Sequence, residues 1–207
     1  REAGVDEADV VKTDGRYLYV MKESSAEISI IDTEKGLKKV GSIRMADTVN
    51  TNEFYLIKDE KRLIAITSER TDSQEDSYLS GNQKVVAITY DISSPEKPKK
   101  LGSVSQSGTY TSSRFSDGYL YLFSEYYIGG EPIKDRPETF VPMVGDSLIR
   151  EKDILLPSSM QGCMYEIVTV IGLDNPSEIS DSKAIFTNGG ELYVSSNNIY
   201  YYETEWS

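Results

Sequence analysis

The sequence predicts an all-β fold, a β-propeller present as a partial ring of about three four-stranded antiparallel blades plus the first hairpin of a fourth. A hairpin pattern occurs four times, at residues 10–19, 54–64, 112–121 and 192–201, as an apolar stretch that enters a polar turn and returns rich in Leu and Tyr. Two further strand-like segments follow each of the first three copies. No helical period is sustained anywhere. A repeated unit that buries one sheet face against the next indicates a propeller or a solenoid.

The turns within the hairpins carry the residues that short hairpin loops need. Asp-Gly occupies the turn at Asp14 and again at Asp117, and Asn-Asn occupies it at Asn197. These residues tolerate the positive φ of a two-residue hairpin loop. We therefore interpret Asp14 first as a turn residue.

The third strand of each unit is rich in β-branched residues and ends on an aspartate, at Asp32, Asp91 and Asp174. The later two run into proline turns at Pro95 and Pro176. An aspartate in this place can close a turn by accepting a hydrogen bond from the backbone just beyond it. Because the aspartate recurs in every unit, its predicted role is structural.

The fourth strands are two nearly identical segments, 39–43 and 100–104, with Gly41 and Gly102 in register, and the third copy decays to 182–185. A weak helical candidate spans Ala46 to Glu53. The chain ends on a strand, so it is expected to be part of a longer domain. Residues 1–207 are assigned to one propeller domain, with blades at about 8–45, 50–105 and 108–187 and the start of a fourth at 190–207.

Composition excludes several classes of chemistry. The net charge is −12 and the pI is about 4.6, which argues against nucleic acid as a partner because phosphate binding needs a basic surface. The sequence has no His and one Cys, Cys163, so Ser-His-Asp, Cys-His and zinc-histidine sites cannot be built from it. No stretch has the length of a membrane span.

Acidic clusters at residues 6–9 and 72–76 could supply oxygen ligands, but neither has the spacing of a calcium loop. We therefore expect no metal and no cofactor, and we assign no catalytic residue.

The insertion from Ser124 to Met164 is the best candidate for recognition. Long excursions on a rigid scaffold are often binding loops, and paired Tyr beside Arg is typical of a contact surface. An alternative is that these side chains only pack the insertion onto the blade. The candidate ligand- or partner-binding residues are Tyr126, Tyr127, Arg136, Phe140 and Asp146.

The opening segment Gly4-Val5-Asp6-Glu7-Ala8-Asp9-Val10-Val11-Lys12-Thr13-Asp14-Gly15 resembles the entry motif of a family of secreted bacterial and archaeal proteins with a C-terminal β-propeller domain. The turn at residues 90–95 and the segments 140–142, 146–147 and 153–154 resemble the same family. The resemblance covers essentially the whole chain. It implies a propeller in an extracytoplasmic, envelope-associated setting and supplies no catalytic residues.

Two functional hypotheses remain open from the sequence, beside a third possibility, a structural spacer with no small-molecule site. The leading hypothesis is a secreted or cell-envelope binding module for protein or glycan at the cell surface. The alternative is a glycan- or peptide-directed hydrolase that uses Asp and Glu at the propeller mouth, with part of its site in missing blades. Self-association is also expected through open blade edges, with Tyr200 to Tyr202 and Trp206 at the edge of the last strand.

Overall fold

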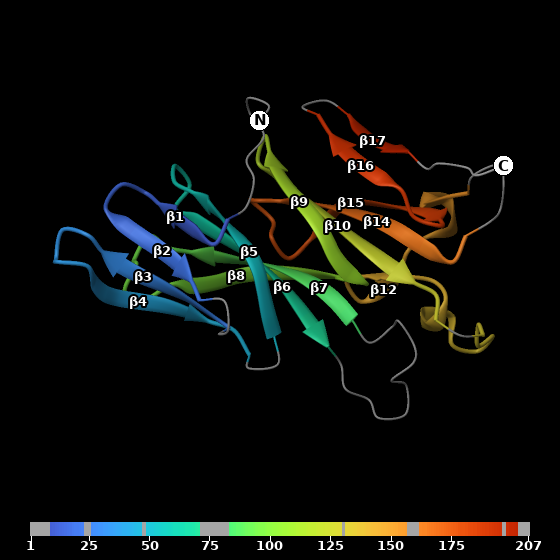
Figure 1. Cartoon of the computed structure of the whole chain (residues 1–207), viewed down its shortest axis with the longest axis horizontal. Helices are drawn as coiled ribbons and strands as arrows, with labels where there is room; N and C mark the ends of the chain where they lie inside the picture. The colour runs from blue at the N-terminus through green and yellow to red at the C-terminus, as the bar shows by residue number, and fades with distance from the viewer. Residues whose placement is uncertain are drawn as a thin grey trace.

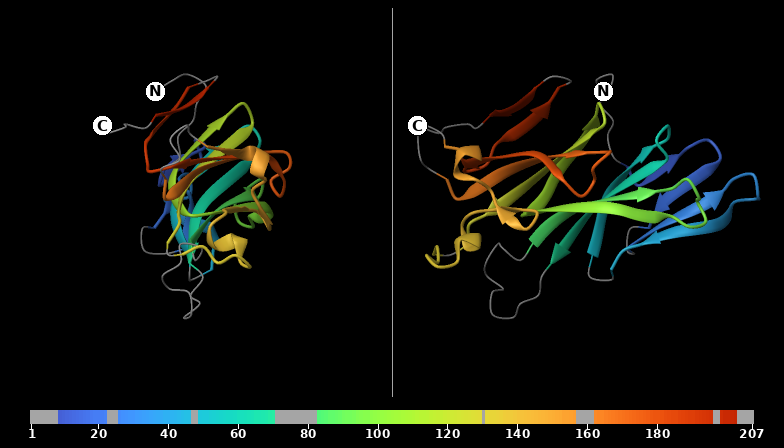
Figure 2. Two further views of the ribbon diagram at one scale, coloured as in Figure 1. Left: turned by 90° about the vertical axis from the view of Figure 1, so that its right-hand side faces the viewer. Right: turned by 180° about the vertical axis from the view of Figure 1, so that it is seen from behind.

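Three antiparallel β-sheets lie side by side along the long axis of the molecule, and a separate hairpin follows the third sheet (Figure 1). The two other views show the same row of twisted sheets from the end and from behind (Figure 2). The computed structural model describes residues 9–22, 26–46, 49–70, 83–129, 131–156, 162–195 and 198–202.

The first sheet is a four-stranded meander whose strands neighbour each other in chain order. Its first turn uses Asp14 as predicted, because the Oδ1 atom accepts hydrogen bonds from the backbone N–H groups of Arg16 (3.0 Å) and Tyr17 (2.7 Å). Gly15 adopts the expected positive φ of 107°. The strands are β1 (Val11–Thr13), β2 (Tyr17–Met21), β3 (Glu27–Asp32) and β4 (Lys38–Arg44).

The second sheet repeats this meander with longer strands. The helix expected over Ala46 to Glu53 is wrong, because residues 49–57 form the first strand of this sheet. Cross-strand pairing from Val49 to Ile57 outweighs the weak local helical preference, and a bulge between Thr51 and Glu53 absorbs the irregular pattern. The strands are β5 (Val49–Ile57), β6 (Arg62–Arg70), β7 (Gln83–Asp91) and β8 (Lys99–Ser107).

The third sheet is built in the same way, with an insertion between its second and third strands. Its fourth strand is longer than the predicted segment 182–185, since it runs from Ile179 to Thr187 and pairs with the third strand along most of its length. Its third strand ends at Gly172 rather than Asp174. The strands are β9 (Thr109–Ser116), β10 (Tyr119–Tyr127), β14 (Met164–Gly172) and β15 (Ile179–Thr187).

Short elements complete the fold. The hairpin predicted at residues 192–201 is present as two strands in a sheet of their own. The insertion carries two 3-10 turns and three two-residue strands. These elements are η2 (Pro137–Thr139), β11 (Met143–Val144), β12 (Ser147–Leu148), η3 (Glu151–Asp153), β13 (Ile154–Leu155), β16 (Glu191–Val194) and β17 (Ile199–Tyr202).

The hydrophobic core is divided into layers between neighbouring sheets. One cluster packs Tyr19 and Ile28 of the first sheet against Phe54 of the second. Another packs Tyr55 of the second sheet against Leu122 of the third. Alternate residues of β5 thus face opposite neighbours, as the two-residue period of a strand requires. The second sheet is apolar on both faces because both are covered.

The two nearly identical segments of the fourth strands, 39–43 and 100–104, each place a glycine where the next sheet makes contact. A Cβ atom at Gly41 would lie 2.1 Å from the carbonyl oxygen of Pro95, and one at Gly102 would lie 2.8 Å from the carbonyl carbon of Pro176. Each proline turn therefore rests on the glycine of the preceding sheet. Only a residue without a side chain allows this approach.

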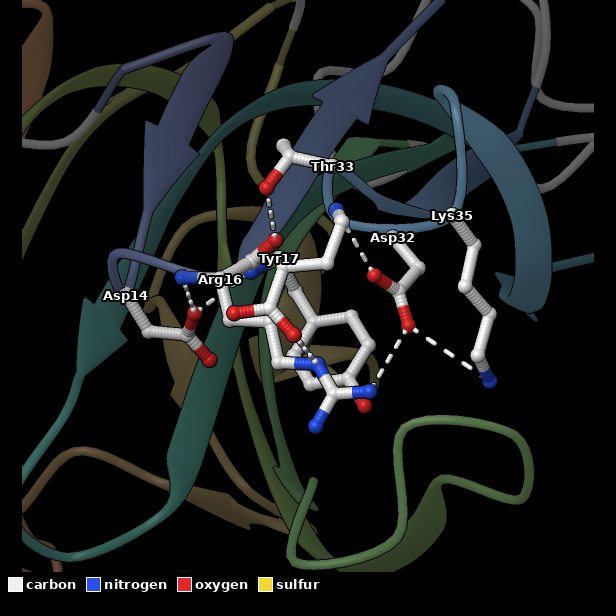
Figure 3. A network of polar contacts seen from close by, with 7 residues as sticks. Asp14, Arg16, Tyr17, Asp32, Thr33 and Lys35 are labelled. Atoms are coloured by element: carbon white, nitrogen blue, oxygen red, sulfur yellow. Dashed lines mark hydrogen bonds and ion pairs between the residues drawn. The ribbon is translucent and has the colours of Figure 1, made fainter.

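The aspartates that end the third strands hold the turns of the first two sheets. Asp32 is fully buried and accepts hydrogen bonds from Arg16 Nη2 (3.0 Å) and from the Glu34 N–H (3.0 Å), with Lys35 Nζ at 3.7 Å (Figure 3). Burial acts to raise the pKa of Asp32, but the hydrogen bond and charge of Arg16 hold it below its usual value. Asp91 accepts a hydrogen bond from the Ser93 N–H in the same way (2.8 Å).

In the third sheet the second strand begins at Tyr119, and the residue that pairs with Tyr119 is Gly172. The equivalent pairs are Tyr17 with Asp32 and Arg62 with Asp91. The predicted equivalence of Asp174 is therefore off by two residues. The aspartate contact is a feature of the first two sheets.

The all-β fold is confirmed, with no α-helix among the described residues. The three sheets do not close into a ring. The number of blades and their predicted boundaries, at 8–45, 50–105, 108–187 and 190–207, stay predictions.

Candidate functional site

The insertion of the third sheet connects two sheets at their outer edges. It leaves β10 after Tyr127 and returns at Met164, and we call residues 128–163 the strap. Val144 of β11 pairs antiparallel with Gln106 of β8 in the second sheet. Ile154 of β13 pairs in parallel with Ala184 of β15 in the third sheet. The strap therefore fixes the spacing between β8 and β15.

Two buried contacts anchor the strap to the third sheet. Asp153 is 3% exposed, accepts a hydrogen bond from Arg150 Nε (2.6 Å) and forms an ion pair with Lys183. The hydrogen bond from Lys183, followed by the contact with Arg150, holds the pKa of Asp153 below its usual value. The Tyr126 hydroxyl donates to the Glu138 carbonyl oxygen (2.7 Å). Glu138 and Asp153 of the strap are therefore anchored to Tyr126 and Lys183 of the third sheet.

A groove lies where the strap crosses the edge of β8. It has a volume of about 600 Å³, within the range of about 300–1,000 Å³ that is usual for ligand sites. Its apolar lining includes Val86 and Ile88 of β7, Val144 of β11 and Ile179 of β15. Hydroxyl groups line much of the rest, at Ser103, Ser105, Ser147 and Ser177.

Four charged side chains line the groove and are of mixed sign. Glu69 and Lys84 form an ion pair with 3.0 Å between Oε2 and Nζ. Lys100 and Asp146 also line the groove, and neither is in an ion pair within the described part of the chain. These two charges remain available to a ligand.

A second cleft of about 310 Å³ lies on the other side of the β11–β12 hairpin. It shares Val144, Ser147 and Ile179 with the groove. Leu148 and Ile179, at the rim, are 36% and 38% exposed. The two hollows are therefore adjacent, and both are lined in part by apolar side chains.

The sequence-predicted contact residues differ in their burial. Tyr126 is fully buried, so the prediction that it contacts a partner is replaced by its anchoring role. Tyr127 is 53% exposed at the end of β10, and Arg136 pairs with Glu138 on the strap (3.2 Å). Phe140 is half-buried.

Asp146 is the one predicted contact residue that lines the groove. The contact roles of Asp146, Tyr127, Arg136 and Phe140 stay predictions.

Sequence reasoning missed the β8 side of the groove, including Lys100, Ser103 and Ser105. The sequence predicts residues 100–104 as a repeated fourth strand, and in the first three sheets the fourth blade strand follows the third at the outer side of the meander. That pattern was the available signal. The contribution of β11 and β12, each of two residues, left no periodic pattern to detect.

The first strands of the second and third sheets carry a hydrogen-bonded cluster around a carboxylate that bears on the hydrolase alternative. Glu53 of β5 accepts hydrogen bonds from Ser113 Oγ (3.1 Å) and Tyr110 Oη of β9, and Ser113 Oγ also contacts Tyr55 Oη at 2.8 Å. Burial raises the pKa of Glu53. Its carboxylate links the second and third sheets, because both of its donors come from the neighbouring sheet.

A second unusual carboxylate lies on the opposite face of the third sheet. Glu166 is 8% exposed, lies directly across from Glu125, and accepts a hydrogen bond from Thr111 Oγ1 (3.4 Å). Burial, and then the charge of Glu125, raise the pKa of Glu166 to about 8. Like charges directly opposite each other destabilise a sheet, so Glu166 is largely protonated at neutral pH.

Of the acidic clusters considered as metal ligands, residues 6–8 and 72–76 lie outside the described residues. In the part of the chain that the structure describes, no three His, Cys, Asp or Glu side chains gather as metal ligands would. Cys163 is exposed. The described residues also contain no helix with the length and apolar character needed to cross a bilayer.

Repeated antiparallel sheets that pack against one another define a repeat scaffold. Comparison with family models shows which one. The model of the family described as "Beta propeller domain" matches residues 1–207, and the chain belongs to that family. A search of curated proteins found no match.

Proposed function

We propose that this chain is a non-catalytic interaction module of a secreted or cell-envelope protein and that it binds a polypeptide segment of a partner in the groove between β8 and the strap. The observation that supports this function is the groove itself, which is lined by the apolar Val86 and Ile88, by four serines, and by Lys100 and Asp146, two charges with no ion-pair partner among the described residues. The volume of the groove is typical of ligand sites, and its lining is more polar than apolar. The extracytoplasmic setting rests on the sequence resemblance.

Polypeptide is favoured over glycan by the chemistry of the lining. Sugar rings present C–H faces that pack on aromatic side chains, and none of the described residues that line either hollow is aromatic. Backbone amides instead find hydroxyl partners at Ser103 and Ser105, and apolar side chains find Ile179 and Leu148. Exposed apolar side chains beside a polar rim mark protein contact sites.

The test is selection of peptides from a random displayed library on the folded protein, followed by binding to a groove-blocked variant. Ser147→Trp places an indole where both hollows meet, and Ser94→Trp, in an exposed turn outside the lining, is the matched control. We expect the selected peptides to lose at least about tenfold in affinity for Ser147→Trp. Equal binding to both variants would place recognition elsewhere.

The hydrolase alternative has one structural observation in its favour, the half-buried Glu53 with its raised pKa. We expect no turnover of glycosidase, esterase or peptidase substrates. Turnover that follows the purified chain and disappears in Glu53→Gln would overturn the assignment as a binding module.

A further inference from the structure

The outer edge of β8 is paired over only a small part of its length. Val144 pairs with Gln106, and the Gly145 N–H donates to the Ser105 carbonyl oxygen (2.7 Å). Along residues 99–104 no strand of the described chain pairs with this edge. Because both the N–H and the C=O of every second residue point to the same side of a strand, Ser103 points its backbone groups outward as Ser105 does, up to the bulge that interrupts β8 between Gly102 and Lys100.

The unpaired part of this edge runs along the groove. Lys100, Ser103 and Ser105 line it from β8, and residues from both faces of the second sheet contribute, Val86 from one face and Val104 from the other. The groove therefore wraps around the edge of β8.

The β11 segment shows how a chain enters this position. It reaches β8 antiparallel, makes a single pair, and turns away at Gly145, whose φ is 63°. A strand that continued along the same line would next meet Ser103. The strap thus begins a strand pairing that the chain itself does not continue.

The charge at this edge indicates the kind of strand that fits. The net charge of the protein is −12, yet Lys97, Lys99 and Lys100 are all exposed where β8 begins. Lysines on an open edge discourage pairing with neutral strands. An acidic strand would turn the same charges into an attraction, and electrostatic complementarity of this kind selects partners.

We propose that the partner segment is an extended acidic peptide that adds to the second sheet as a strand, antiparallel to β8 along residues 99–104. This inference rests on the proposed function and specifies its ligand and its mode of binding. Backbone hydrogen bonds to the edge would supply affinity, and the two sides of the groove would read alternate side chains, as in other complexes that extend a sheet.

The probe is a pool of labelled peptides of about six residues with Glu at every second position. It is compared with the same pool methylated on alternate backbone nitrogens, which keeps every side chain and removes the donors. Fluorescence anisotropy on the whole folded chain gives the affinity. We expect the parent pool to bind and the methylated pool to lose at least about tenfold.

Two variants test the edge itself. Ser103→Pro removes an outward N–H while leaving the ladder to β7, since proline is tolerated on edge strands, and its fold is checked by circular dichroism. The double variant Lys99→Glu, Lys100→Glu reverses the charge, with Lys58→Glu in an exposed turn as the control. We expect a loss of about tenfold or more for each of the first two and less than about twofold for the control.

The outcomes separate this inference from the proposed function. Should methylated peptides bind as well as the parent pool while Ser147→Trp abolishes both, the groove binds peptides without strand addition and only this inference fails. Absence of binding by the acidic pool would also overturn it. A concentration-dependent dimer that Ser103→Pro abolishes and that excludes the peptide would make a second copy of the chain the occupant, and would overturn the acidic partner.

Discussion

The contact between Gly102 and the third sheet predicts that Gly102→Ala lowers stability even though alanine is a conservative change. An ideal Cβ atom at Gly102 would lie 2.3 Å from Ser177 Oγ and 2.8 Å from both the Pro176 carbonyl carbon and the Ser177 nitrogen. The hydroxyl can rotate away, but the backbone atoms cannot. Moving them to 3.4 Å, the start of ordinary contact, displaces the turn by about 0.6 Å.

The expected cost follows from overpacking a well-packed interface. Such changes cost about 1–3 kcal/mol, and the turn resists displacement because the Glu178 N–H donates to the Asn175 carbonyl oxygen across it (3.0 Å). Alanine offsets up to about 1 kcal/mol of this cost, because it lowers the conformational entropy of the unfolded chain. We expect a net loss of about 1–2 kcal/mol, or a fall in Tm of about 2–8 °C for a domain of this size.

The assay is urea unfolding followed by far-ultraviolet circular dichroism, with Gly172→Ala as the matched control. A Cβ atom at Gly172 meets nothing closer than 3.6 Å, so this variant should be as stable as the parent or slightly more stable. Adding Ser177→Ala to Gly102→Ala should restore only part of the loss, because the backbone contact remains. Equal stability of the two single glycine variants would refute the reasoning.

Three further predictions concern buried polar groups. Because the folded-state pKa of Glu166 is raised to about 8, the protein should lose stability as pH rises from about 4.5 to about 8. At pH 9 the unfolding free energy of Glu166→Gln should exceed that of the parent by up to about 4 kcal/mol, and Glu125→Gln should give a smaller gain in the same unfolding series. The pKa of Asp153 is lowered, so its contribution is present above the usual pKa and is lost as pH falls through the lowered value. Asp153→Asn should cost about 1 kcal/mol at pH 7, and a cost that does not shrink as the pH is lowered through the titration of Asp153 would contradict the ion-pair explanation. Tyr126→Phe should cost about 1 kcal/mol in unfolding free energy and leave peptide affinity unchanged, whereas an affinity loss without a stability loss would return Tyr126 to the binding surface.

Local sequence determined the repeating part of this protein. Asp14 and Gly15 make the predicted turn because the aspartate carboxylate and the positive φ of glycine both act within a few residues. Consecutive apolar residues such as Phe54 and Tyr55 favour a strand that is buried on both faces, and these two side chains pack into different core clusters. The sequence shows Gly41 and Gly102 in two nearly identical segments, although only the structure shows that each contacts the proline turn of the next sheet.

The tertiary structure alone decided the candidate site. Tyr126 and Tyr127 are adjacent in sequence, yet one is fully buried and the other is 53% exposed, because consecutive residues of β10 point to opposite faces and the strap covers only one of them. The pairing of Val144 with Gln106 and of Ile154 with Ala184 joins residues that are far apart in the chain. Two-residue strands have no period to recognise, so the groove that they form exists only once the sheets are packed.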